Sequence, residues 1–154
     1  PARFEVRRGT LKQGDYSVAG FEDRIAIERK NPQDFLGSMG NGRDRFMREL
    51  ERLAEYEYAD IVVDSFDWRR YYAGEYRSKF SDNAILGTTA SIRMKYNVHT
   101  YIYPDIHGAQ THAEEIFWLW VRRVMEGKSR DPEADQAIAR AISIAPPRLA
   151  DSVS

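Results

Sequence analysis

The chain has 154 residues, of which 42% are hydrophobic and 31% are charged, with 23 basic against 24 acidic residues. This composition suits one soluble globular domain and excludes both a disordered tail and a highly basic packaging protein. The absence of cysteine excludes thiolate catalysis and zinc-finger ligation. No run of about 18 apolar residues encodes a membrane span, and no charged-then-apolar leader opens the chain, so we expect an intracellular protein of the cytoplasm or nucleoid.

The near-neutral net charge of the chain conceals local excesses of positive charge. Residues 1–48 hold ten basic against seven acidic residues, and residues 69–79 hold four against one. Because phosphate binding depends on local clusters, the net charge does not exclude a nucleic-acid partner. Arginine outnumbers lysine 18 to 5, which suits bidentate phosphate contacts but is equally typical of a GC-rich genome.

The front of the chain predicts an antiparallel meander of three short strands, which glycine turn signals separate: residues 4–8, 16–19 and 25–30. The pair Asn31-Pro32 ends the third strand, and a short helix is expected from about Gln33. After a glycine-containing break at residues 37–42, Asn41 is the expected cap of a long helix. Its apolar stripe consists of Phe46, Leu50 and Leu53.

The remaining elements predict an α/β fold. We expect a buried strand at residues 59–64, an aromatic and basic loop or short helix at 66–80, and a helix at 82–96. A strand at 98–103, a strongly apolar helix at 107–125 and a polar tail with one weak helix at 128–154 follow. The helix before the buried strand makes a parallel crossover plausible. We therefore expect a central mixed sheet flanked by helices, with a main domain at 1–127 and a tail at 128–154.

Three charged residues near the front point to a catalytic site. Asp15 begins one predicted strand, and Glu28 and Lys30 alternate on the next, so both face the same side of the sheet. The two carboxylates are hard oxygen ligands of the sort that Mg²⁺ prefers, and a lysine beside the metal can orient the attacking water. The chemistry indicated is phosphodiester hydrolysis. On its own the triplet is also typical of a solvated strand face.

The residues around this triplet resemble the nuclease domain of the XPF family of structure-specific endonucleases. That family's motif is Gly-Asp, a variable gap, Glu-Arg-Lys, three residues and Asp. The matching segments are LKQGDY at residues 11–16, IERKNPQDF at residues 27–35 and GR at residues 42–43. The resemblance implies a restriction-endonuclease-like fold and a Mg²⁺- or Mn²⁺-dependent DNA endonuclease that cuts branched, flapped or junction DNA in repair or recombination.

The resemblance also implies roles for individual residues. Asp15 and Glu28 would be metal ligands, the Arg29 carbonyl a third ligand, and Lys30 the neighbour of the attacking water. The motif ends at Asp34, which lies near a helix start, where we expect it to hold Arg29 or Lys30 by a charge-assisted bond.

The expected DNA contacts lie outside the motif. The family position of Arg43 implies contact with the DNA backbone or with the carboxylates, and Arg45 is added on charge alone. The basic and aromatic segment around Arg69, Arg70 and Lys79 is typical of single-strand binders. It is equally typical of an ordinary surface loop.

Two departures from the family pattern shape the expectation. Relatives carry an upstream strand with an Asp-x-Arg-Glu motif, and no such motif precedes Gly14, so we expect this first strand to be missing and the activity to be weakened. Relatives often append helix-hairpin-helix modules, for which the tail from Lys128 has no room, so a stand-alone viral or bacterial nuclease domain is expected.

The aromatic helix at residues 107–125 leaves two interpretations open. Its wide apolar face predicts a core helix packed on a sheet. The six consecutive large apolar residues at 116–121 also suit a homodimer contact, which the resemblance implies. Two other functions remain as alternatives: a catalytically silent DNA-binding or dimer-partner subunit of the same fold, and an oligomerisation module that does not bind DNA.

Overall fold

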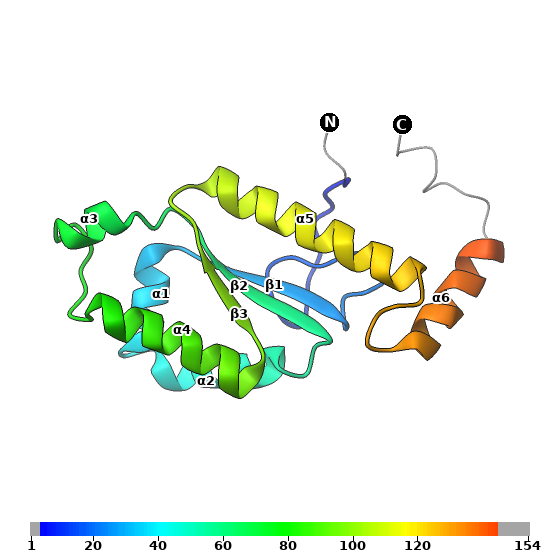
Figure 1. Ribbon diagram of the computed structural model, residues 1–154, viewed down its shortest axis with the longest axis horizontal. Helices are drawn as coiled ribbons and strands as arrows, with labels where there is room; N and C mark the ends of the chain where they lie inside the picture. The colour runs from blue at the N-terminus through cyan, green and yellow to red at the C-terminus, as the bar shows by residue number, and fades with distance from the viewer. Residues whose placement is uncertain (1–3, 145–154) are drawn as a thin grey trace. The chain divides into compact units, whose positions relative to one another are not determined.

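The computed structural model describes residues 4–144, which fall into two compact units, Thr10–Thr111 and a second unit made of residues 4–9 and 112–144 (Figure 1). The elements are β1 (Ile25–Lys30), α1 (Pro32–Met39), α2 (Arg43–Leu53), β2 (Tyr58–Val63), α3 (Trp68–Tyr72), α4 (Asp82–Tyr96), β3 (His99–Ile102), α5 (Ile106–Met125) and α6 (Pro132–Ile144). None of the helices in the described part is long and apolar enough to cross a membrane.

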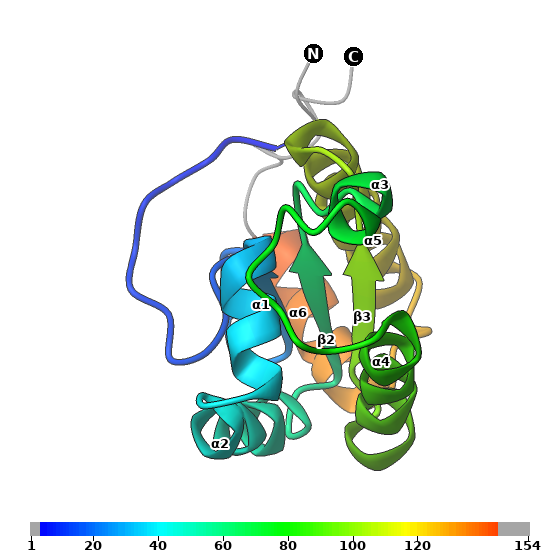
Figure 2. The same cartoon turned by 90° about the vertical axis from the view of Figure 1, so that its left-hand side faces the viewer.

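The centre of the first unit is a three-stranded parallel sheet in the order β1-β2-β3. In its register, Glu28 lies opposite Ile61, and Val63 lies between Lys30 and Ile102. Figure 2 shows the arrows of β2 and β3 side by side and pointing the same way. The predicted α/β fold with parallel strands and flanking helices is therefore confirmed.

One face of this sheet is covered by α1, α2 and α4, which Figure 1 shows together on one side of the strands. The fully buried side chains of Ala26, Ile61 and Val63 pack with apolar residues of the three helices in a single core cluster. Because side chains alternate along a strand, Glu28 and Lys30 lie on this same face as Ala26. The two charged residues therefore project toward the helices at the end of β1.

The predicted antiparallel meander is wrong. Residues 4–8 and 16–19 form no strands, and the only antiparallel pairing among the described residues is a single bridge between Tyr16 and Ile27. The Asp15 carboxylate accepts from the Arg29 backbone N–H, and the Ser17 hydroxyl donates to the Ile25 carbonyl. These side chains therefore occupy positions on β1 that a regular ladder of backbone hydrogen bonds would use. The alternation of apolar residues and the spacing of glycines could not predict this arrangement, because side chains take the place of backbone hydrogen-bond partners.

Helix starts follow local sequence closely. The Asn31 side chain accepts from the backbone N–H of Asp34 at 2.8 Å and caps α1, and the Ser81 side chain caps α4 through Ala84. The expected cap of α2 is displaced by one residue, since Gly42 rather than Asn41 occupies that position and makes no side-chain cap bond. The predicted short helix within residues 66–80 is α3.

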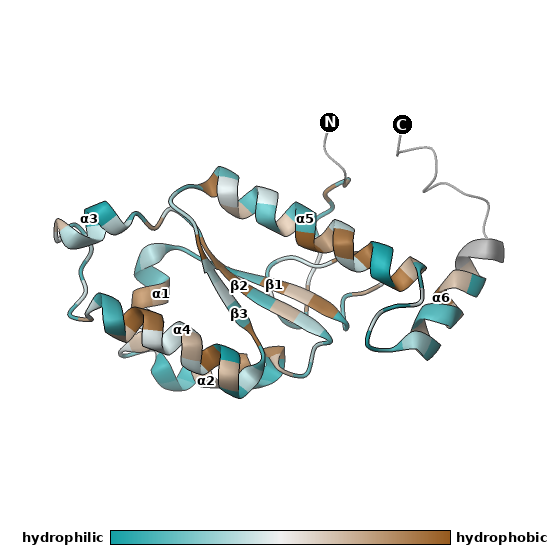
Figure 3. Cartoon of the chain, viewed as in Figure 1, coloured by the Kyte–Doolittle hydropathy of each residue, from teal (hydrophilic) through white to brown (hydrophobic). Residues whose placement is uncertain are grey.

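The second unit contains most of α5 and all of α6. Figure 3 shows hydrophobic colouring on part of α5. Three side chains of this helix are buried: Phe117, Trp120 and Val124. Phe4 meets Phe117 edge to face, with ring centroids 6.4 Å apart. Leu119 and Met125 on the same helix stay about half exposed. The predicted weak helix of the tail is α6.

Candidate active site

Asp15 lies at the free edge of β1, where a glycine lets the chain approach closely. Gly14 has a φ of +78°, and a Cβ added to it would lie 3.0 Å from the Cβ of Ala26, so only glycine fits without strain. The next residue donates its backbone N–H to the Ile27 carbonyl at 2.9 Å. Its carboxylate accepts the backbone N–H of Arg29 at 2.8 Å. The Asp15 carboxylate is thereby placed beside the second half of β1.

Glu28 and Lys30 meet a third charged residue, Glu49, which α2 presents from above the same face of the sheet. The Lys30 Nζ lies 3.1 Å from a Glu49 carboxylate oxygen and 3.7 Å from one of Glu28. All three side chains are largely buried, with 11% of Lys30 and 15% of each glutamate exposed. The structure therefore brings together the predicted Asp15, Glu28 and Lys30, and adds Glu49.

The proximity of the carboxylates changes the protonation of Glu28. Burial, the hydrogen bond to Glu49 and the negative charges of Glu49 and Asp15 together raise the pKa of Glu28 to about 8, while Lys30 opposes them. At neutral pH this carboxyl therefore keeps its proton and donates it in the hydrogen bond to Glu49. Such crowding of acids beside a lysine is typical of catalytic sites.

The donor set suits a hard divalent cation. Within residues 4–144, no three His, Asp or Glu side chains form a ready cluster around one ion. Asp15 and Glu28 nevertheless act on each other electrostatically, and both offer oxygen ligands of the kind that Mg²⁺ and Mn²⁺ accept, with water or phosphate oxygens completing the shell. A cation would favour the charged form of Glu28, which burial, the hydrogen bond to Glu49 and the neighbouring negative charges now oppose. These two residues are the ones that could hold it.

Arg29 belongs to the opposite face of the sheet. Its guanidinium Nε donates to the carboxylate of Asp64, which is 2% exposed and directly follows β2. This hydrogen bond compensates for the burial of the Asp64 carboxylate, and it raises the pKa of Arg29. The side chain of Arg29 is thus locked in place while its backbone N–H holds Asp15.

The contact expected for Asp34 is wrong. We predicted that Asp34 holds Arg29 or Lys30, but its carboxylate accepts from the Asn31 side-chain amide at 2.8 Å at the start of α1. Asp64 holds Arg29 instead, and Glu49 holds Lys30. Asp34 is drawn into the capping arrangement because Asn31 is three residues away on the same helix turn.

The predicted DNA-contacting residues lie in two places of the same unit. Arg43 and Arg45 are exposed on the first turn of α2, after the turn that follows α1. Arg69 and Arg70 belong to α3, where they lie near Asp67 and Glu75 at 3.5 and 2.5 Å, and Lys79 is exposed in the segment before α4.

Sequence reasoning missed two residues of this site. Glu49 is not among the predicted site residues, although it follows Phe46 by three residues and so borders the apolar stripe of its helix. Asp64 was assigned to a strand, although an acid directly after a buried parallel strand marks the carboxyl edge where functional groups collect. Both signals are in the sequence, but neither identifies the partner without the fold.

Solved structures of known proteins resemble the fold of this chain. XPF from Aeropyrum pernix has a similar structure, with a TM-score of 0.55, 28% identity, and coverage of 72% of this chain and 48% of that one. A structure of XPF from the same organism in complex with DNA matches with a TM-score of 0.51 and 23% identity, over 86% of this chain and 68% of the other.

A curated relative is a putative ATP-dependent RNA helicase of Methanocaldococcus jannaschii, 29% identical over 97 residues, which are 63% of this chain and 10% of the helicase. The chain therefore spans about a tenth of that relative and about half of the first XPF chain. The ERCC4 domain matches residues 2–110, which include every residue of the candidate site. The chain belongs to the ERCC4 domain family and carries an XPF-type nuclease domain.

Proposed function

We propose that the protein is a divalent-metal-dependent DNA endonuclease that hydrolyses phosphodiester bonds in branched, flapped or junction DNA. One observation supports this most strongly: in a chain with an XPF-type nuclease domain, Asp15, Glu28 and Lys30 come together with Glu49 at one end of β1. The ERCC4 family suggests cleavage of DNA in repair, and recombination is a second setting for the same reaction.

In this proposal each side chain has a distinct task. Asp15 and Glu28, with the Arg29 carbonyl as a third donor, would hold Mg²⁺ or Mn²⁺, which supplies charge stabilisation at the phosphate. Lys30 orients the attacking water and is kept in position by Glu49. Asp64 is a positioning residue, because it fixes Arg29, whose backbone N–H in turn holds Asp15.

The proposal assigns the DNA contacts to the two basic groups of the same unit. Arg43 and Arg45 lie at the start of the helix that carries Glu49, so they can bind phosphates next to the cut. Arg69, Arg70 and Lys79 would bind the backbone further along. Phosphate contacts of this kind position the substrate without reading its sequence.

The test is cleavage of labelled flap, fork and four-way-junction DNA in Mg²⁺, Mn²⁺ or EDTA. We expect cutting with either metal and none in EDTA, and we expect Asp15→Ala and Glu28→Ala each to lower the rate by at least roughly 100-fold. Glu51→Ala, which removes an exposed acid from α2, is the control and should cut normally. Cutting that survives in both site variants would refute the assignment, and binding without any cut would favour the silent DNA-binding subunit.

A further inference from the structure

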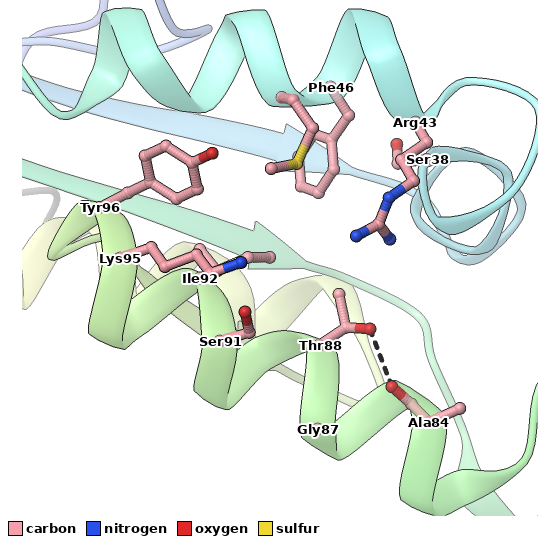
Figure 4. A pocket seen from close by; sticks show the side chains of 11 residues that line it. Ser38, Arg43, Phe46, Ala84, Gly87, Thr88, Ser91, Ile92, Lys95 and Tyr96 are labelled. Atoms are coloured by element: carbon pink, nitrogen blue, oxygen red, sulfur yellow. Dashed lines mark hydrogen bonds between the residues drawn. The ribbon is translucent and has the colours of Figure 1, made fainter.

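A small pocket lies between the end of α1, the first half of α2 and the length of α4, all within Thr10–Thr111. Its volume is about 210 Å³. Figure 4 shows the Arg43 guanidinium extending from α2 toward α4, with Thr88 below it and the rings of Phe46 and Tyr96 to its left. None of the residues assigned above to the metal or to Lys30 lines it.

The charge of this pocket is positive. Arg43 and Lys95 are its charged lining residues, both are exposed, and no acidic side chain lines it. Within the described residues, neither cation forms an ion pair or a side-chain hydrogen bond. Two basic side chains directed at one space without a carboxylate between them favour an anion, since an opposing charge would relieve their repulsion.

The remaining walls are apolar or aromatic. Phe46 and Met47 come from α2, and Ile92 and Tyr96 come from α4. A ligand that satisfies both halves of the lining has an anionic group and a flat, weakly polar body. The volume lies below the roughly 300–1,000 Å³ of pockets for drug-sized ligands, so the occupant is small or is one unit of a longer chain that continues into solvent.

The pocket shares a wall with the candidate active site. The ring of Phe46 lines the pocket, and the Lys30 Nζ lies 5.1 Å from the centroid of the same ring. Arg43 is one turn before Phe46 on α2. A group bound in the pocket would therefore lie against the same aromatic ring as Lys30.

We propose that this pocket binds one unpaired nucleotide of a single-stranded DNA segment next to the cut. Arg43 and Lys95 hold its phosphate, and the base lies against Phe46, Ile92 and Tyr96. A paired base is kept inside the duplex stack and cannot enter, so the pocket selects DNA with an unpaired strand. This inference rests on the proposed function, since it names how the same site would recognise its substrate.

The direct test uses thymidine 5′-monophosphate, thymidine and inorganic phosphate as probes, titrated into the full chain in EDTA and followed by NMR. We expect the nucleotide to bind saturably and each fragment to bind at least tenfold more weakly. A six-residue oligothymidylate should displace the mononucleotide. Phosphate binding as tightly as the nucleotide, no binding of the nucleotide at all, or no displacement by the oligonucleotide would each overturn the proposal.

Two variants connect this binding to the pocket. Lys95→Ala removes one phosphate partner, and Gly87→Leu fills the space, because a Cβ at this helical glycine meets no atom within 4 Å and leucine favours a helix. Both should weaken nucleotide binding at least tenfold. Arg93→Ala is the matched control, since a residue two positions away on a helix points to nearly the opposite side, and it should bind normally. Unchanged binding in both pocket variants would refute the site.

Cleavage separates this inference from the function on which it rests. We expect Lys95→Ala and Gly87→Leu to cut flapped DNA about tenfold more slowly while Asp15→Ala does not cut at all. If the pocket variants cut flaps as fast as the wild-type protein while Asp15→Ala is inactive, the pocket proposal fails and the endonuclease stands. If the wild-type protein cuts nothing but binds the nucleotide, the endonuclease fails and the pocket stands.

Discussion

Glu28 links the protonation of the site to the stability of the protein. Its pKa is about 8 in the folded chain and near 4.5 when unfolded. Below about pH 4.5 both states hold the proton. Between about 4.5 and 8 only the folded state does, so in metal-free protein the free energy of unfolding falls as the pH rises through this window.

The variant Glu28→Gln removes this titration. Between pH 5 and pH 8 in EDTA, we expect its melting temperature to decline less than that of the wild-type protein. The corresponding difference in unfolding free energy is on the order of a few kcal/mol. The measurement is thermal unfolding by circular dichroism across that range. Glu51→Gln, at an exposed position on α2, should follow the wild-type curve. Parallel curves for Glu28→Gln and wild type would contradict the assignment.

Lys30 depends on Glu49 for its place. The two are joined at 3.1 Å, and the lysine also lies over the Phe46 ring. We expect Lys30→Ala to lower the cleavage rate by roughly 100-fold and Glu49→Gln to lower it by about tenfold, with a shifted pH–rate profile because the charge beside Lys30 and Glu28 changes. Steady-state cleavage from pH 6 to 9 checks both. A Glu49→Gln profile that keeps the wild-type shape would show that Glu49 has only a structural role.

At the scale of elements, Gly14 allows the loop before β1 to approach the strand closely enough to place Asp15 beside it. Gly14→Ala places a side chain at a φ of +78° and 3.0 Å from Ala26. We expect it to destabilise the protein by more than the roughly 1–2 kcal/mol that a left-handed residue costs and to lower cleavage as well. Gly20→Ala has a similar φ of +86° in open space, so it should show the conformational cost alone. Equal losses in urea unfolding would mean that the contact with β1 is unimportant.

The elements also show what sequence can and cannot predict. Helix α1 begins within one residue of the expected start at Gln33, and α4 spans the expected residues 82–96, because the signals that begin and end a helix act over a few neighbouring residues. The partners of a strand are distant in sequence, so the pairing of β1 with β2 and the loss of the meander could not be read from alternation. The motif predicts the triplet of Asp15, Glu28 and Lys30 because its residues are fixed in sequence. The contact of Glu49 with this triplet depends on the fold, so the sequence does not predict it.

At the scale of the whole molecule, the proposed homodimer depends on α5. Leu119 and Met125 are 50% and 48% exposed on this helix, so both large apolar side chains are accessible to a second copy of the chain. We expect the wild-type protein to run as a dimer in light scattering coupled to size exclusion. Leu119→Glu should shift it toward the monomer. Glu114→Gln, an exposed position on the same helix, is the control, and a wild-type monomer at all concentrations would rule the dimer out.

The bond between the Asp15 carboxylate and the Arg29 backbone has a consequence outside catalysis. The outer edge of β1 would otherwise present open donors and acceptors to any passing strand, which is how sheets associate edge to edge. The segment around Asp15, Tyr16 and Ser17 occupies that edge through three kinds of bond, two of them made by side chains. The carboxylate that we propose as a metal ligand thus also blocks edge-to-edge association, so Asp15 variants should be judged for solubility as well as for activity.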